Sequence, residues 1–251
     1  MSAANRASSN PLQAKKSEDD NFDDNFALKP WLVALRADAK KNPGPMRANL
    51  PVRILPHLYL GDCECARNLE NLSRLKITHV LNVAGRGSSN SDLDFGSAGI
   101  EHFDVDALDE DNYEMLDLHL NFAREVFERA RKANGICLVH CRQGMNRSGV
   151  LAAAEVILFK RITVLDAVNK CRLERGTGFL SNSGFQKQLI LMSASESLLG
   201  PEPLELKPTT PLKPLKPLEH LKPLKPLKPL EPLEKAEKLE EPFVMPELVT
   251  P

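Results

Sequence analysis

The chain has 251 residues and a formal net charge of −1 at pH 7, with 33 Lys and Arg against 34 Asp and Glu. This balance argues against bulk binding of nucleic acid or of an anionic membrane surface, so neither is expected among the partners. The five cysteines are odd in number and loosely spaced, which is unlike a disulfide framework and favours a reducing compartment. No apolar run in the sequence is long enough to span a bilayer. A cytoplasmic protein is therefore expected, with the nucleus as a further location.

Residues 1–50 are expected to form an N-terminal extension. Its first part is polar and rich in Ser, Asn and Asp, which predicts disorder. Residues 28–41 predict a short helix that the following prolines end. Its apolar side chains fall on one side: Trp31, Leu32 and Leu35. We expect this helix to pack on the domain that follows, with a docking peptide as the alternative.

Residues 51–198 alternate strand and helix patterns, which predicts an α/β domain with a central mixed, mostly parallel sheet flanked by helices. Residues 85–99 are rich in Gly and Ser and predict a mobile surface loop. Thr163 with Asp166 predicts the capped start of a helix over residues 164–172. One helical face is expected in the core, formed by Leu116, Leu120, Ala123, Phe127 and Ala130.

The segment from residue 136 to residue 159 predicts a strand, a tight loop and a helix. Its first four residues are apolar and β-prone, and residues 149–159 have a helix-like sequence. The loop between them, residues 140–148, is His-Cys-Arg-Gln-Gly-Met-Asn-Arg-Ser. Such a loop turns backbone N–H groups inward and adds the positive end of a helix dipole, which predicts an anion site. A thiol held there loses its proton readily, because the site stabilises the thiolate.

These residue types suit attack on a phosphate ester. Cys141 would act as the thiolate nucleophile, and Arg147 offers a planar fork that can hold two phosphoryl oxygens. Gly144 lets the backbone approach an oxyanion closely, and Ser148 can donate its hydroxyl to the sulfur. His140 is expected to orient the loop through hydrogen bonds. The remaining residues expected to bind the phosphate are Arg142, Gln143, Met145 and Asn146. The alternative, a core cysteine beside a surface arginine, leaves the combined pattern unexplained.

The loop resembles the His-Cys-x5-Arg-Ser/Thr motif of the protein tyrosine phosphatase superfamily, and its flanks resemble the atypical dual-specificity branch. The flanking matches are Ile54–Gly61, Ile77–Val83 and Asn182–Leu189. The resemblance covers about residues 51–198 and implies the cysteine-phosphatase fold. It also implies hydrolysis of phosphotyrosine and phosphoserine or phosphothreonine in proteins through a phosphocysteine intermediate, with no cofactor and no metal. One departure is Ser181, where the family usually has proline, and this is expected to loosen the start of the next helix.

A phosphatase of this family also needs a general acid to protonate the leaving oxygen. The resemblance implies an aspartate ahead of the cysteine, at a spacing that Asp109 fits better than Asp106 or Asp111. Spacing alone leaves the choice open, and Asp106 is the second candidate. A solvated acidic turn is the plain alternative. Asn182 is expected to support the site.

Other functions stay open from the sequence. With an asparagine before Arg147, the loop resembles that of relatives that remove phosphate from RNA 5′ ends. Phosphoinositides are a further substrate class, although Arg142 is the only additional cation of the loop. A phosphoprotein-binding pseudophosphatase or an adaptor is the alternative from another class. Phosphorylated proteins are the expected partners, with kinases as further candidates. Cys137 is either a strand cysteine or a disulfide partner for an oxidised Cys141.

Residues 199–251 are expected to form a tail outside the domain. From residue 211 to residue 233 leucine recurs every third position, with proline and mostly lysine in the other two phases. This period predicts a polyproline II helix or disorder, because proline at such density excludes an α-helix. A partner with an aromatic-lined groove is one use of such a tail, and a passive extension is the other.

Overall fold

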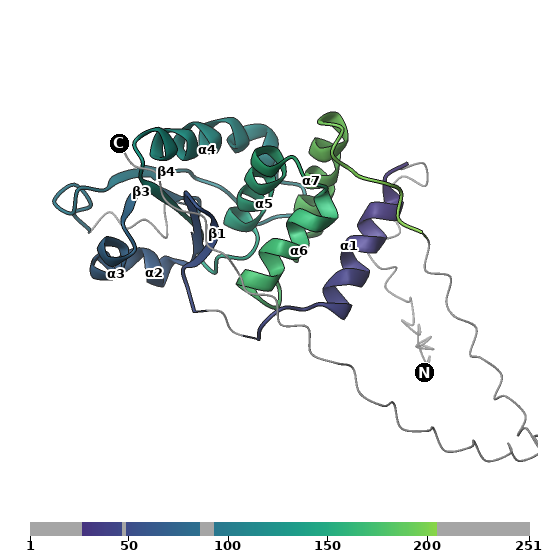
Figure 1. Ribbon diagram of the computed structural model, residues 1–251, viewed down its shortest axis with the longest axis horizontal. Helices are drawn as coiled ribbons and strands as arrows, with labels where there is room; N and C mark the ends of the chain where they lie inside the picture. Colours follow the sequence, from purple (N-terminus) through teal and green to yellow (C-terminus); the bar gives the residue numbers. More distant parts are fainter. Residues whose placement is uncertain (1–26, 47–48, 86–92, 205–251) are drawn as a thin grey trace, which may run out of the picture. The chain divides into compact units, whose positions relative to one another are not determined.

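The computed structural model describes residues 27–46, 49–85 and 93–204, and Figure 1 shows a sheet with helices on both sides. The sheet has five strands in the order β1-β2-β5-β3-β4. The strands are β1 Val52–Leu55, β2 Leu58–Gly61, β3 Ile77–Asn82, β4 Glu101–Asp104 and β5 Ile136–His140. Strands β1 and β2 are antiparallel and all other neighbours are parallel, which confirms the predicted mixed α/β sheet. The segments predicted to be disordered, at residues 1–25 and in the leucine–proline repeat, lie outside the described residues.

Helices cover both faces of the sheet. Figure 1 shows α4 on one side and the short helices α2 and α3 on the other. Helix α5 packs against α4, α6 and α7, and α1 packs on α6 and α7. The bounds are α1 Lys29–Lys41, α2 Cys63–Arg67, α3 Leu69–Arg74, α4 Met115–Lys132, α5 Arg147–Lys160, α6 Val164–Arg175 and α7 Ser183–Ser195. None of the helices in these ranges is long and apolar enough to cross a membrane.

Successive side chains of the central strand face two hydrophobic cores, one on each side of the sheet. Leu138 of β5 joins the core under α2 and α3, whereas Cys137 and Val139 join the larger core under α4 and α5. A strand covered on both faces needs apolar residues at every position, which explains the continuous apolar run in β5. Helix α5 is enclosed by neighbouring helices, and all its residues from Ser148 to Ile157 are buried. The predicted core face of α4 is confirmed, with Leu120 half-buried and its other members buried.

Helix α1 packs on α6 and α7, the first of the two roles considered for residues 28–41. Its apolar residues Trp31, Leu32 and Leu35 are buried. The Trp31 indole Nε1 donates to the main-chain oxygen of Leu199 at 3.1 Å. This contact ties the helix to the segment that follows α7.

In the segment predicted as a mobile surface loop, residues 85–99, residues 94 and 96–99 are exposed as a surface loop requires, but Phe95 is not. Phe95 is buried and stacks on the ring of His102 in β4, with ring centroids 4.3 Å apart. This aromatic contact anchors the segment to the sheet, while residues 86–92 lie outside the described ranges. The predicted cap of α6 is confirmed, because the hydroxyl of Thr163 accepts a hydrogen bond from the backbone N–H of Asp166 at 3.3 Å.

Candidate active site

The candidate site lies where parallel strands end at the middle of the sheet. His140 is the last residue of β5 and pairs with Asn82 of β3 and Gly61 of β2. The chain then forms a loop over residues 141–146 and enters α5 at Arg147. Ligands of open α/β sheets bind beyond the carboxyl ends of the strands, and a helix N-terminus there favours anions. The observed strand, loop and helix confirm the local structure that the sequence predicts.

The loop depends on a close approach at Gly144. This residue has φ +66°, and a Cβ there would lie 2.4 Å from the main-chain oxygen of Gly61. Both features require glycine. From this position the backbone N–H of Gly144 donates to the Cys141 sulfur at 3.2 Å. The turn thus directs a main-chain donor toward the centre of the loop.

Arg175 at the end of α6 holds the outer side of the loop. Its Nε donates to the main-chain oxygen of Gly144 at 2.8 Å, and its Nη2 donates to that of Gln143 at 2.5 Å. Burial lowers the pKa of this guanidinium from its usual value. Because two successive carbonyls are bound on the outside, their peptide planes cannot rotate freely. The arginine therefore preserves the orientation of the loop amides.

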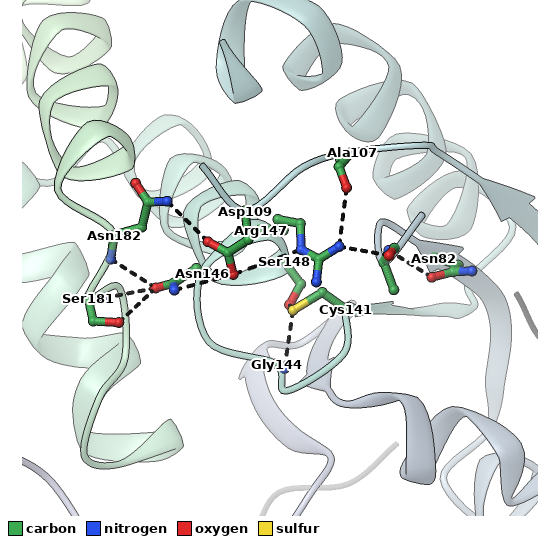
Figure 2. A network of polar contacts seen from close by, with 11 residues as sticks. Asn82, Ala107, Asp109, Cys141, Gly144, Asn146, Arg147, Ser148, Ser181 and Asn182 are labelled. Carbon is green, nitrogen blue, oxygen red and sulfur yellow. Dashed lines mark hydrogen bonds and ion pairs between the residues drawn. The ribbon is translucent and has the colours of Figure 1, made fainter. Parts of the chain in front are cut away.

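Cys141 is almost completely buried, with 2% of its surface exposed. Its sulfur accepts hydrogen bonds from the Gly144 N–H and from the Ser148 hydroxyl, each at 3.2 Å. Ser148 is fully buried in the first turn of α5. Donors aimed at a sulfur stabilise its negatively charged form. Figure 2 shows these two contacts at the sulfur.

The guanidinium of Arg147 is fixed beside this sulfur (Figure 2). Its Nη1 donates to the main-chain oxygens of Ala84 at 2.7 Å and Ala107 at 3.1 Å. Ala84 is held in turn by Asn82, whose side-chain oxygen accepts from the Ala84 N–H at 2.9 Å. The Nε of Arg147 has no hydrogen-bond partner among the described residues, and it lies 3.9 Å from a carboxylate oxygen of Asp109. The arginine is therefore oriented from one side and keeps a donor for a ligand.

Asp109 lines the same cavity beside Arg147, and the cavity has a volume of about 320 Å³. Its Oδ1 accepts from Asn182 Nδ2 at 3.1 Å and its Oδ2 from Asn146 Nδ2 at 3.4 Å. Asp111 turns away and accepts a hydrogen bond from the Ser183 hydroxyl at 2.9 Å. Asp106 does not line this cavity. Of the three aspartates considered from the sequence, Asp109 is the one that lines the cavity together with Cys141. The cavity is lined by Asp109, Cys141, Arg142, Gln143, Met145, Asn146 and Arg147.

His140 differs from its expected role. Its ring is fully buried, and neither nitrogen has a partner of good hydrogen-bonding geometry among the described residues. Burial lowers the pKa of His140 to about 4, with the nearby backbone of Cys141 acting in the opposite direction. The ring is therefore neutral at physiological pH. Among the described residues the ring makes no hydrogen bond of good geometry that would orient the loop, in contrast to the prediction.

The other cysteines lie outside the cavity. Cys137 is fully buried in β5, and burial raises the pKa of its thiol. The strand from Cys137 to its end at His140 spans roughly 10 Å at about 3.3 Å per residue. A disulfide allows only about 7 Å between Cα atoms, which argues against Cys137 as a partner for Cys141. In the part of the chain that the structure describes, no three His, Cys, Asp or Glu side chains gather as a metal site requires.

Two residues that shape the site were missed by the sequence analysis. Asn82 ends β3 and orients the carbonyl that binds Arg147, and Arg175 ends α6 and holds the loop. A polar residue at the end of a buried parallel strand is a usable signal for the first. The second lies in an ordinary basic final helical turn, so nothing in its local pattern distinguishes it.

A loop of this sequence at the carboxyl end of the central strand, on this sheet, defines the protein tyrosine phosphatase superfamily. The family model "Dual specificity phosphatase, catalytic domain" matches residues 58–195, more than half of the chain. The chain therefore belongs to the dual-specificity phosphatase family. Membership supports a hydrolase of the protein phosphatase class, with phosphorylated proteins as its class of substrate.

Individual relatives agree with this assignment. Dual specificity protein phosphatase 26 of Bos taurus is 33% identical over 164 residues, which cover 65% of this chain and 76% of that protein. Dual specificity protein phosphatase 13B of Mus musculus is 31% identical over 138 residues, covering 54% and 69%. The crystal structure of the human tyrosine phosphatase-like serine/threonine/tyrosine-interacting protein matches with a TM-score of 0.53 and 23% identity, covering 58% of this chain and 97% of that one. This last likeness supports the fold.

Proposed function

We propose that this protein is a cysteine-dependent phosphatase that hydrolyses phosphotyrosine and phosphoserine or phosphothreonine in proteins. The observation that carries the proposal is one cavity lined by three groups of complementary chemistry. They are the Cys141 sulfur with two donors directed at it, the guanidinium of Arg147, and the carboxyl group of Asp109. These groups match the needs of phosphoryl transfer, in which a nucleophile, a charge clamp and a proton donor act together.

In the first step the Cys141 thiolate attacks phosphorus and forms a sulfur–phosphorus bond. The bond between phosphorus and the substrate oxygen breaks, and protonated Asp109 gives its proton to that oxygen as it leaves. Arg147 binds two non-bridging oxygens and stabilises their charge throughout. The products of this step are the free hydroxyl of the substrate and phosphocysteine.

In the second step water attacks the phosphocysteine. Asp109, now a carboxylate, accepts a proton from that water, and the phosphorus–sulfur bond breaks. The sulfur leaves as a thiolate, which the Ser148 hydroxyl stabilises by donating to it from 3.2 Å. Inorganic phosphate is released and Asp109 is protonated again. Both steps use side chains of this chain, so the proposal assigns no metal and no cofactor to them.

The cavity wall favours a single phosphate group on a protein over a densely phosphorylated ligand. Besides Arg147, Arg142 is the one cation that lines the cavity in the described residues, and Asp109 contributes the opposite charge. Phosphoinositides and triphosphorylated RNA carry several negative charges, which call for more compensating cations than these. The names of the relatives, dual specificity protein phosphatases 26 and 13B, support both aryl and alkyl phosphates as substrates. Kinases as partners and a groove-binding role for the tail remain predictions.

The test is turnover of p-nitrophenyl phosphate by the full chain, followed by a panel of phosphopeptides, phosphoinositides and triphosphorylated RNA. We expect turnover that vanadate inhibits and that Cys141→Ser abolishes, with release of phosphate from phosphotyrosine and phosphoserine peptides. Binding of phosphopeptides without turnover would instead indicate a pseudophosphatase or adaptor. Turnover that survives in Cys141→Ser would overturn the mechanism, and a preference for RNA or phosphoinositide would overturn the substrate class.

A further inference from the structure

Asn146 has one defined orientation, although an amide oxygen and nitrogen have similar shapes. Its Oδ1 accepts hydrogen bonds from the Ser181 N–H at 2.8 Å, the Ser181 hydroxyl at 3.2 Å and the Asn182 N–H at 3.1 Å. Two of these partners are backbone N–H groups, which can only donate. The oxygen of Asn146 must therefore face residues 181 and 182. Its Nδ2 is then left to face the carboxylate of Asp109 (Figure 2).

Two amide groups consequently hold the carboxylate of Asp109, one on each oxygen. Asn182 Nδ2 donates to Oδ1 at 3.1 Å, and Asn146 Nδ2 donates to Oδ2 at 3.4 Å. Asn182 is itself fixed, because its side-chain oxygen accepts from the Phe185 N–H at 3.0 Å and caps α7. The phosphate-binding loop, the loop that carries Asp109 and the start of α7 thus meet at one hydrogen-bonded cluster. We call Asn146, Ser181 and Asn182 the amide brace.

Ser181 supplies two of the three donors that orient Asn146. The sequence departs here from the proline that is usual in the family, and a proline has no N–H to donate. The predicted loosening of the helix start is not observed, because Asn182 still caps α7. The serine instead adds a connection from this helix to the loop. Asn146, expected to bind the phosphate, directs its side chain to this connection.

We infer that Asn146 and Ser181 are positioning residues that hold Asp109 where it can transfer a proton to the leaving oxygen. This role rests on the proposed function. The donors on both carboxylate oxygens restrict rotation of the carboxyl group, and they connect it to the same loop that holds the nucleophile. Displacement of the proton donor therefore matters most when the leaving oxygen needs a proton most.

This dependence on the leaving group gives the inference a specific signature. p-Nitrophenolate is a good leaving group and needs little protonation, whereas phenolate and serine alkoxide are poor ones. A positioned general acid contributes roughly 10²–10⁴-fold to rate. Asp109 is also the base in the second step, which is the same for every substrate, so the signature is read in kcat/KM, which reports the formation of phosphocysteine. Loss of the brace should therefore reduce kcat/KM about ten- to a hundredfold for phenyl phosphate and a phosphoserine peptide. The reduction of kcat/KM for p-nitrophenyl phosphate should stay below about fivefold.

The variants separate the parts of the brace. Asn146→Leu removes the acceptor and the donor together, and Asn146→Asp keeps the oxygen that Ser181 and Asn182 bind but replaces the donor to Asp109. Ser181→Pro removes the N–H and the hydroxyl, while Ser181→Ala removes the hydroxyl alone and should show a smaller effect. Ser183→Ala is the matched control, because its hydroxyl binds Asp111 and not Asp109. It should keep the leaving-group dependence of the unmodified protein.

The result expected is a steeper dependence of log kcat/KM on leaving-group pKa in both Asn146 variants and in Ser181→Pro, at unchanged thermal midpoints. Equal losses on all three substrates, or no losses, would overturn the inference. A variant that fails to fold is replaced by the other member of its pair, and Asn146→Asp, which keeps the size of the side chain, decides the result. Failure of the proposed function would give a different result: the Cys141→Ser variant would then turn over substrate as the unmodified protein does.

Discussion

Replacement of Arg175 by methionine should lower turnover by one to two orders of magnitude in a protein that still folds. The guanidinium donates to the main-chain oxygens of Gly144 and Gln143, and Gly144 is buried whereas Gln143 is exposed. A hydrogen bond to a charged group contributes about 1.5–3 kcal/mol. Water can replace the bond to Gln143 but cannot reach Gly144. Removing the guanidinium should therefore destabilise the observed loop conformation by about 3 kcal/mol relative to conformations that misdirect the amides.

A bias of about 3 kcal/mol corresponds to about a hundredfold in rate if the misdirected loop is inactive. The assays are kcat for p-nitrophenyl phosphate and the rate at which iodoacetate alkylates Cys141, with urea unfolding as the check on folding. Arg175→Lys is the matched control, since an ammonium keeps the charge and can bind one carbonyl but not both. It should retain activity between those of the methionine variant and the unmodified protein. Turnover within threefold of the unmodified protein in Arg175→Met would refute this account of the loop.

Three further perturbations test other parts of the structure. Gly144→Ala should reduce kcat more than tenfold, because the added Cβ would lie 2.4 Å from a main-chain oxygen. Gly99 has a similar φ of +68° with no atom within 4 Å of an added Cβ, so Gly99→Ala should stay active. Equal effects of the two variants would show that φ alone matters. The pKa of His140 is about 4 in the folded protein, and an unfolded histidine has a pKa of about 6.5. The unfolded chain therefore takes up the proton first, so stability is full above pH 6.5 and is lost as the pH falls toward 4. Between pH 7 and 5 the unfolding free energy should drop by about 2 kcal/mol more than in His140→Gln, measured by urea titration; parallel curves would contradict a neutral buried ring. Asp109→Ala should slow hydrolysis of phosphotyrosine peptides much more than Asp106→Ala, and equal losses would contradict the assignment of the general acid.

The sequence predicts the fold and the phosphate loop well because both depend on local patterns. The apolar run before Cys141 predicts β5, and the helix-like run after Ser148 predicts α5. The loop between them needs a glycine at position 144, where φ is +66° and the backbone of another strand approaches closely. Each of these signals lies within a few residues of the feature that it predicts. The structure adds their distances and their burial.

The missed or misjudged parts depend on contacts between distant segments. Arg175 reaches a carbonyl 31 positions away, and Asn82 bonds to Asp104 across 22 positions. Phe95 lies in a Gly- and Ser-rich stretch, yet it is buried because His102 stacks on it. The side chain of Asn146 faces Asp109 because donors from Ser181 and Asn182 occupy its oxygen, an arrangement that loop spacing alone does not reveal. Pairings of this kind follow from tertiary structure.

Distant contacts also hold the loop that carries Asp109, the proposed general acid, against α7. Asp109 is tied to α7 through Asn182, and Gln188 of α7 donates to the main-chain oxygen of Tyr113 at 2.7 Å and accepts from the Leu116 N–H at 3.0 Å. The loop is thus held by one helix at Asp109 and again where α4 begins. The entropy of placing the carboxyl group is lost during folding and not in each turnover, which is the advantage of a preorganised site. A loop that is fixed in this way should also be sensitive to small displacements of α7, because the helix carries the acid with it.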